Sequence, residues 1–150
     1  MENRVLFICT GNYYRSRYAE AVFNHHSEAL GLPWRAFSRG LATHLIPPGF
    51  YLSPQTEEHL LARNIDLRHT AADKQQLSEQ DLADANLIIA LKDDEHRPMV
   101  HTMFPEWEEK MLFWDVGDQP HVAPDEGLGQ IHAHVLELIE ELREASEVAA

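Results

Sequence analysis

Apolar residues along the chain fall into two patterns. Nearly continuous apolar runs, which are typical of strands covered on both faces of a parallel sheet, occur at 4–9 and 86–91. Shorter strands are predicted at 34–38 and 111–114. Apolar positions at helical spacing separate these runs, so the pattern predicts strands that alternate with helices.

Start and stop signals bound the helices of the first half. The first predicted helix follows a polar loop and ends at Gly31 and Pro33. Ser53 followed by Pro54 is a typical N-cap and first-turn pair. The helix that this pair opens is expected to fade near Asn64.

The second half adds three predicted helices. Ser78 caps a short helix to about Ala85, and a second helical segment covers 93–104. From Leu128 onward, apolar positions form one stripe at helical period. Strands alternating with helices predict a single α/β domain over 1–150, a doubly wound parallel sheet with helices on both faces, and a ligand site at the carboxyl ends of its strands.

Charge and composition narrow the possible partners. The formal net charge of -13 opposes binding to nucleic acid and to anionic membrane surfaces. No segment is long and apolar enough for a transmembrane span, and Met1 leads into a strand-like segment without a signal-peptide pattern. We therefore expect a cytoplasmic protein that binds neither nucleic acid nor membrane, and its oligomeric state stays open.

Cys9 is the only cysteine in the chain and stands where the first predicted strand ends. It opens the loop CTGNYYRS at 9–16, which places a thiol, five residues, an arginine and a hydroxyl between a strand and a helix. Backbone N–H groups in such a loop can converge on an anion, and the following helix adds its positive end. Gly11 permits the unusual dihedral angles required, and Asn12 tolerates a left-handed conformation and can tie down neighbouring backbone.

The composition of this loop predicts phosphate chemistry. N–H dipoles and a guanidinium favour the thiolate form of Cys9, which is the useful nucleophile. Arg15 can hold two phosphoryl oxygens in parallel, and Ser16 can donate a hydrogen bond to the sulfur. Attack on phosphorus would give a phosphocysteine intermediate. The alternative, a buried strand-end cysteine and an arginine that simply begins a helix, is disfavoured by the glycine, asparagine and serine of the same loop.

The loop CTGNYYRS, with AEA in the helix after it, resembles the phosphate-binding signature of the low-molecular-weight protein tyrosine phosphatase family. Weaker similarity extends through Ser38-Arg39-Gly40, the segment ADANLIIAL and an acidic segment after the last strand. The resemblance implies a four-stranded parallel domain and a cofactor-independent phosphatase of phosphotyrosine or similar aryl phosphates, on a protein or a small molecule. It implies catalytic roles for Cys9 and Arg15, and phosphate-binding or supporting roles for Thr10, Gly11, Asn12, Tyr13, Tyr14 and Ser16.

A carboxylic acid that protonates the leaving oxygen is expected on the loop after the last strand. Family members carry an aspartate there, usually followed by proline, and in this chain Asp118 is preferred, with Asp115 as the alternative. Either aspartate can also be read as a solvated turn residue. Gln119 interrupts the aspartate-proline pair, and His121 and Val122 stand where aromatic residues are expected, which leaves substrate preference open.

Two departures from the family lie inside the signature itself. Tyr14 stands where many members have a second cysteine, so a protective disulfide with Cys9 cannot form. Arg17 stands where many members have proline. Aromatic residues that can wall a pocket for an aryl phosphate, led by the one inside the loop, are Tyr13, His44, Phe50 and Tyr51.

Metal binding and three other functions were weighed against hydrolysis. Ten histidines suggest a metal site, but His132 and His134 are two apart on a predicted helix and diverge, so no metal is predicted. Arsenate reduction needs further thiols, which this chain would have to take from outside. A phosphocarrier is disfavoured by Arg15 and a nearby acid, and a non-catalytic phosphate-binding or partner-docking module remains the other alternative.

Overall fold

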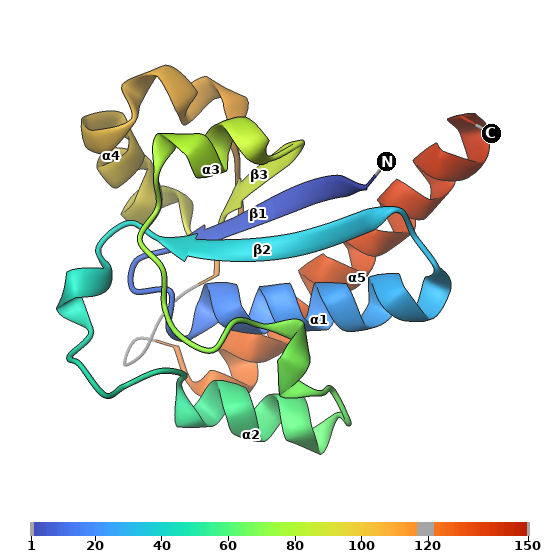
Figure 1. Ribbon diagram of the computed structural model, residues 1–150, viewed down its shortest axis with the longest axis horizontal. Coiled ribbons are helices and arrows are strands. Elements are labelled where there is room, and N and C mark those ends of the chain that lie inside the picture. Colours follow the sequence, from blue (N-terminus) through green and yellow to red (C-terminus); the bar gives the residue numbers. More distant parts are fainter. Residues whose placement is uncertain (1, 117–121, 150) are drawn as a thin grey trace.

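A single parallel sheet with helices on both faces forms the protein, seen in a computed structural model that describes residues 2–116 and 122–149 (Figure 1). The strand order is β2-β1-β3-β4, and every pairing is parallel. The predicted four-stranded α/β fold is therefore confirmed. The strands are β1 (Asn3–Cys9), β2 (Trp34–Gly40), β3 (Leu87–Ala90) and β4 (Leu112–Phe113).

The helices follow the predicted order, with a few shifted bounds. The last helix begins four residues before the predicted Leu128, at a proline that is a known first-turn residue. The long loop predicted at 43–52 contains a short 3-10 turn. The helices are α1 (Arg15–Leu30), α2 (Pro54–Ala62), α3 (Glu79–Asp84), α4 (Asp93–Met103) and α5 (Pro124–Ala149), with 3-10 turns η1 (Thr43–Leu45), η2 (Leu67–His69) and η3 (Pro105–Lys110).

The predicted caps explain where these helices begin and end. Gly31 ends α1 in the left-handed conformation, with φ of 66°. The Ser53 hydroxyl accepts the Thr56 N–H at 3.4 Å and so caps α2. Ser78 forms a reciprocal capping box with Asp81 at the start of α3.

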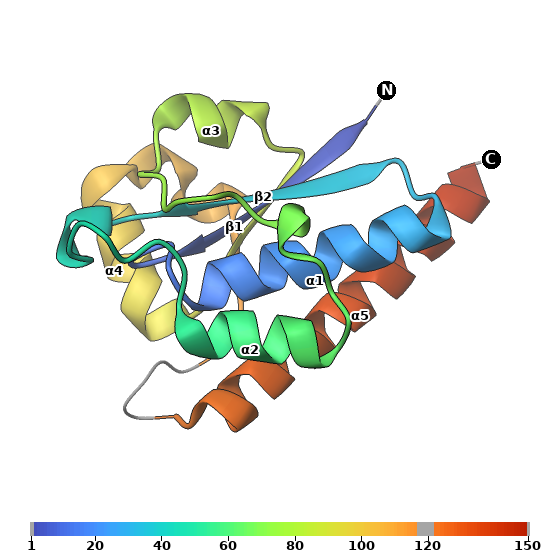
Figure 2. The same cartoon turned by 60° about the horizontal axis from the view of Figure 1, so that its bottom comes forward.

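Two apolar cores cover the two faces of the sheet. On one face, Val5 and Phe7 of β1 pack with residues of α1, α2 and α5, the helices that lie together in Figure 2. On the other face, Leu6 and Ile8 pack with residues of α3 and α4. Because alternate residues of β1 face opposite cores, the strand is buried from Val5 to Cys9, as the apolar run there predicts.

The topology places one edge of the sheet for ligand binding. The chain runs from β1 to its neighbour β2 and then crosses back over β1 to β3. The point where the winding reverses lies between β1 and β3, and ligands of open α/β sheets bind beyond the carboxyl ends of strands at such a point. The segments that begin there are the loop after Cys9 and the start of α4.

Candidate active site

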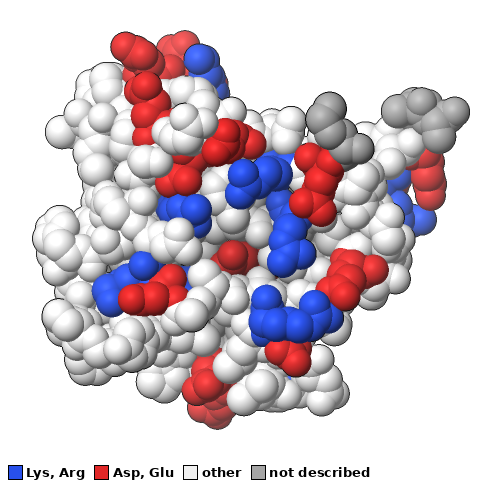
Figure 3. Space-filling model, in the orientation of Figure 1, with Lys and Arg blue, Asp and Glu red and all other residues white. Residues whose placement is uncertain are grey.

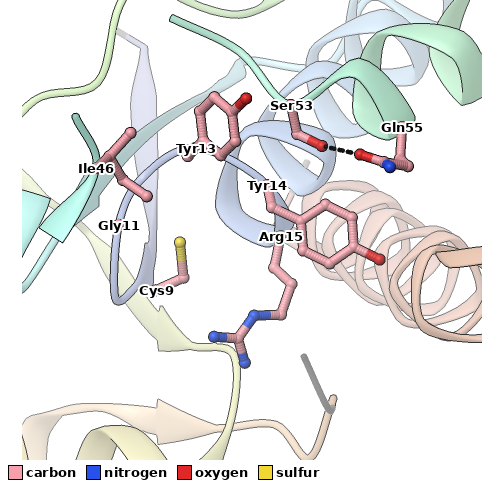
Figure 4. A pocket seen from close by; sticks show the side chains of 8 residues that line it. All are labelled: Cys9, Gly11, Tyr13, Tyr14, Arg15, Ile46, Ser53 and Gln55. Atoms are coloured by element: carbon pink, nitrogen blue, oxygen red, sulfur yellow. Dashed lines mark hydrogen bonds between the residues drawn. The ribbon is translucent and has the colours of Figure 1, made fainter. Parts of the chain in front are cut away.

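The loop at 9–16 joins β1 to α1 and presents the thiol of Cys9 toward a pocket (Figure 4). Cys9 is 3% exposed. Its Sγ lies 2.9 Å from the Ser16 hydroxyl, which is the contact predicted from the sequence. The backbone N–H of Asn12 also donates to Sγ, at 3.3 Å. The Asn12 N–H therefore donates to the sulfur, and the Ser16 hydroxyl shares a second hydrogen bond with it, in which either group can be the donor.

Asn12 organises the loop through its side chain and its backbone. Its φ of 54° is left-handed, which confirms the conformation expected for this residue. Its Nδ2 donates to the hydroxyls of Ser16 at 2.8 Å and Ser38 at 2.9 Å. Its Oδ1 accepts the backbone N–H of Gln75 at 2.8 Å. The Asn12 side chain thus fixes Ser16 against Cys9 and ties the loop to β2 and to the segment before α3.

The glycines beside the loop provide space rather than left-handed geometry. The prediction that Gly11 supplies unusual dihedral angles is corrected, because the left-handed residue of the loop is Asn12 and not Gly11. A Cβ on Gly11 would lie 2.8 Å from the Ile46 side chain. A Cβ on Gly40, at the end of β2, would lie 2.8 Å from the Thr10 carbonyl oxygen and 2.9 Å from the Asn12 nitrogen. Only glycine at position 40 lets β2 approach the loop backbone this closely.

Arg15 opens α1 and is held by a carboxylate that the sequence did not single out. Its Nη2 lies 2.7 Å and its Nη1 3.2 Å from the two carboxylate oxygens of Glu95, in the first turn of α4. Nη1 also donates to the carbonyl of Val116 at 3.1 Å. A bidentate pair of this kind fixes the plane of the guanidinium as well as its position.

Glu95 is held in turn by the second residue of the loop, Thr10, and by a buried histidine. The Thr10 hydroxyl donates to Glu95 Oε2 at 2.5 Å, and His96 Nε2 lies 3.1 Å from the same oxygen. His96 Nδ1 accepts the backbone N–H of Lys92 at 3.0 Å, so Nε2 carries the proton of a neutral ring. Partial burial opposes ionisation of Glu95, but the hydrogen bonds from His96, Arg15 and Thr10 and the Arg15 charge outweigh it and hold its pKa well below the usual range.

The pocket above Cys9 has a volume of about 160 Å³. Tyr13, the predicted wall residue, and Ile46 stand at its rim in Figure 4, with Tyr14 near Arg15. The remaining lining residues come from the start of α2, where the Ser53 hydroxyl donates to the Gln55 side-chain carbonyl at 3.0 Å. The complete lining is Cys9, Gly11, Tyr13, Tyr14, Arg15, Ile46, Ser53 and Gln55.

The other three aromatic candidates do not line this pocket. His44 and Tyr51 line a neighbouring hollow of about 530 Å³ that shares Ile46 with the first pocket. The Phe50 side chain is exposed. The expectation that these three residues wall the Cys9 pocket is therefore wrong. The residue that does so, Ile46, has no aromatic character that would have marked it.

The two aspartates proposed as general acid differ in what the structure describes. Asp118 lies outside the described residues. Asp115 has a side chain that is 77% exposed and forms an ion pair with Lys92. Its neighbour Val116 is buried and is the residue whose carbonyl receives Arg15.

Sequence reasoning missed Glu95 and His96, although one signal pointed to them. They follow the third predicted strand, and the carboxyl ends of parallel strands meet at one edge of a sheet. Acidic residues in the first turn of a helix are also expected simply to complement its dipole. Because the helix start alone accounts for an acidic residue at this position, the sequence did not reveal that Glu95 contacts Arg15.

Charges elsewhere on the surface are paired locally. On the face in Figure 3, basic side chains lie beside acidic ones. Among the ion pairs of the described residues, Arg39 lies 3.1 Å from Asp81 and Arg68 lies 3.0 Å from Glu28. Because the net charge of -13 repels anions at longer range, an anion at the loop would have to be held by short-range donors.

Two searches of the described residues gave negative results. Within 2–116 and 122–149, no three His, Cys, Asp or Glu side chains are grouped closely enough to hold a metal ion. No helix in the described part of the chain is long and apolar enough to cross a membrane.

A buried thiol with two hydrogen-bond partners, at the carboxyl end of a central parallel strand and near an arginine held by a carboxylate, is the arrangement of a cysteine-based phosphate site. The comparison with protein families agrees with this class. Residues 4–146 match the family described as low molecular weight phosphotyrosine protein phosphatase, and the chain belongs to that family.

Individual relatives point to more than one phosphatase activity. A protein-arginine-phosphatase from Bacillus subtilis is 29% identical over 108 residues, which are 72% of this chain and 67% of the relative. The crystal structure of a low molecular weight protein tyrosine phosphatase from T. tengcongensis is 31% identical, with a TM-score of 0.76 over 96% of this chain and 99% of that one. YfkJ from Bacillus subtilis is 26% identical, with a TM-score of 0.77 over 97% of both chains.

Proposed function

We propose that this chain hydrolyses phosphate monoesters, with Cys9 as the nucleophile and Arg15 as the phosphate clamp. One observation carries the proposal: the Cys9 sulfur sits at a pocket, accepts the Asn12 N–H and is hydrogen-bonded to the Ser16 hydroxyl. A buried structural cysteine needs no such partners, whereas a nucleophilic thiolate needs donors, and the Ser16 hydroxyl can donate to it.

The reaction divides into two displacements at phosphorus. In the first, the Cys9 thiolate attacks, an S–P bond forms and the P–O bond to the leaving group breaks, with the proton supplied by a carboxylic acid. In the second, water attacks the phosphocysteine, the S–P bond breaks, and the carboxylate takes the proton from water. Arg15 and the loop N–H groups bind the phosphoryl oxygens in both steps.

Asp118 is the general acid that we propose. The alternative, Asp115, is exposed and pairs with Lys92. Asp118 follows Val116 by two positions, and the Val116 carbonyl is hydrogen-bonded to Arg15. Asp118→Asn should slow hydrolysis of esters with poor leaving groups much more than of nitrophenyl phosphate, because good leaving groups need no proton. An equal loss on both substrates would move the role to Asp115 or remove it.

Aryl phosphates are the substrates we favour, phosphotyrosine among them. The Tyr13 and Tyr14 side chains and Ile46 line the pocket above the thiol and offer surfaces on which an aromatic ring can pack. Phosphoarginine is a second candidate, because a protein-arginine-phosphatase is among the relatives. We also infer a cytoplasmic location, since a catalytic thiol has to stay reduced.

The test is hydrolysis of para-nitrophenyl phosphate between about pH 5 and 8, a range that brackets the expected ionisations of thiol and acid. The assay contains EDTA and compares the wild type with Cys9→Ser. Turnover that is abolished in Cys9→Ser supports a cysteine phosphatase. Binding of orthovanadate without turnover would identify a non-catalytic phosphate-binding protein. Matched peptides that carry phosphotyrosine or phosphoarginine then distinguish the two substrates by kcat/KM.

A further inference from the structure

Arg17, two residues after Arg15, is completely buried under the signature loop. Its guanidinium donates to three segments that are distant in sequence. Nη1 donates to the carbonyls of Asn12 at 3.4 Å and Tyr51 at 3.0 Å, and Nη2 donates to the carbonyl of Ala71. One side chain therefore joins the loop to the segments that precede α2 and α3.

A closed ring of buried and partly buried hydrogen bonds passes through Arg17 and returns to Asn12. Arg17 Nε donates to the Thr70 hydroxyl at 2.6 Å, and that hydroxyl donates to Glu20 Oε1 at 2.7 Å. The Ser38 hydroxyl donates to the same oxygen at 2.8 Å and itself accepts from Asn12 Nδ2 at 2.9 Å. Asn12 is thus held at its carbonyl by Arg17 and at its side chain by the far end of the ring.

The buried charge of Arg17 is held mainly by neutral groups. Its nearest carboxylate, Glu20 Oε1, lies 3.9 Å away, so neutral oxygens supply most of its contacts. Burial lowers the pKa of Arg17, while the charges of Glu20, Cys9 and Asp73 raise it. An arginine remains a cation after such a shift, because its pKa starts far above neutrality. Arg17 is therefore a buried cation that neutral oxygens hold in place.

We propose that Arg17 is a positioning residue that locks Asn12, and with it the anion-binding loop, in the shape that activates Cys9. Its fork of donors holds the loop against the segments at Tyr51 and Ala71. A proline, which many family members have at this position, has no donor with which to do so. This role rests on the proposed function, since a loop without catalysis would need the same lock only for binding.

If Arg17 locks the loop in this way, the site requires the shape of its guanidinium and not only its positive charge. Lysine keeps the charge but presents a compact ammonium on a flexible stem, which cannot satisfy acceptors on three segments at once. Arg17→Lys should therefore behave like Arg17→Gln. If Arg17 acted only as a nearby charge, lysine would restore the wild-type behaviour.

The experiment compares wild type, Arg17→Gln, Arg17→Lys and Val22→Ala. Val22 is buried on the same helix away from the ring, so Val22→Ala controls for lost stability. The first readout is the pH dependence of iodoacetamide alkylation, which reports Cys9 alone because the chain has no other cysteine. Inhibition or binding by orthovanadate and para-nitrophenyl phosphate turnover are the second and third readouts, and melting temperature is recorded for each variant.

Both Arg17 variants should shift the alkylation midpoint upward by about 0.5 to 1 pH unit, toward the free-thiol value near 8.5. Vanadate binding and kcat should fall about tenfold to a hundredfold, as expected for a misplaced site. Val22→Ala should lower the melting temperature with neither change. A midpoint and vanadate affinity within about twofold of wild type in Arg17→Gln, or full rescue in Arg17→Lys, would overturn the proposal.

Two further measures keep the test decisive: readouts that do not need turnover, and a second variant. If the wild type hydrolyses no phosphoester, the proposed function has failed, but alkylation and vanadate binding still report on the lock. If Arg17→Gln does not fold, Thr70→Val takes its place, because it removes the hydroxyl that joins Arg17 to Glu20. An unchanged midpoint and vanadate affinity in Thr70→Val would then count against the ring.

Discussion

Two arginines hold the signature loop at 9–16 from opposite sides, and they differ in the charge of the groups that they contact. On the pocket side, Arg15 pairs with the carboxylate of Glu95, whose side chain is 33% exposed. On the core side, Arg17 is enclosed by neutral oxygens, and its nearest carboxylate, Glu20, is also buried. Both guanidinium groups are buried, but the carboxylate on the pocket side is partly exposed to solvent, where the proposed phosphate would enter. The core side admits nothing, so its hydrogen bonds can fix the shape of the loop.

The largest effect is expected from replacing the guanidinium of Arg15 on the pocket side. Arg15→Lys should lower kcat/KM for para-nitrophenyl phosphate by about 10²- to 10³-fold, because lysine cannot bind two phosphoryl oxygens in parallel. Steady-state kinetics measures the loss. Arg97→Lys, on α4 and paired with Asp93, is the matched control and should keep wild-type kinetics. A loss below about threefold in Arg15→Lys would mean that Arg15 does not touch the phosphoryl group in the transition state.

The next largest effect is expected from a substitution that pushes the end of β2 away from the loop backbone. Gly40→Ala places a Cβ against Thr10 and Asn12, so it should lower kcat/KM about tenfold or more and destabilise the protein by about 1–3 kcal/mol. Urea denaturation and kinetics measure both changes. Gly129→Ala is the control of opposite sign: its Cβ meets nothing within 4 Å, and alanine in α5 should stabilise by about 0.5–1 kcal/mol. Wild-type activity in Gly40→Ala would show that the loop tolerates displacement.

The parts of the site that could be predicted are those contiguous in sequence. Cys9, Arg15 and Ser16 follow one another at a strand-helix junction, and their residue types alone predict the chemistry. Glu95 comes to the loop only through the parallel sheet, and its acidic character has an ordinary explanation at a helix start. Arg17 was harder still, because arginine is rarely fully buried and its polarity indicates an exposed position.

The fold was more predictable than the site for a related reason. The burial of β1 on both faces from Val5 onward requires a run of apolar residues, and this run is visible in the sequence. The caps at Ser53 and Ser78 act through neighbouring residues and were equally visible. The close approach of Gly40 to the loop depends on strands that meet in space, so no local pattern could reveal it.

A smaller effect loosens the pocket side without removing the clamp. Glu95→Gln keeps the shape of the side chain but replaces an ion pair with neutral hydrogen bonds to Arg15 and Thr10. We expect kcat to fall about tenfold from poorer orientation of Arg15, with the Cys9 alkylation midpoint shifted less than in Arg17→Gln. Kinetics and alkylation on the same preparations measure this. An alkylation shift larger than that of Arg17→Gln would reverse the assignment of the two sides.

The smallest effect is a pH dependence of stability that differs between the two sides, because the pKa values of Glu20 and Glu95 are shifted in opposite directions. Burial raises the pKa of Glu20, against hydrogen bonds from Thr70 and Ser38 and the Arg17 charge. The pKa of Glu95 is lowered, since its hydrogen bonds and the Arg15 charge outweigh burial. A lowered pKa stabilises the fold above the ordinary value of 4.5, and this is lost as pH falls. A raised pKa stabilises the fold at low pH, and this is lost as pH rises.

Urea denaturation of wild type, Glu95→Gln and Glu20→Gln between about pH 3 and 8 tests these signs. The advantage of wild type over Glu95→Gln should shrink by about 1 kcal/mol as pH falls below 4.5, a modest value because the Glu95 carboxylate is partly solvated. Relative to Glu20→Gln, wild type should instead lose stability as pH rises above 4.5. Two curves that change in the same direction would mean that Glu20 is solvated and that the core side is not closed.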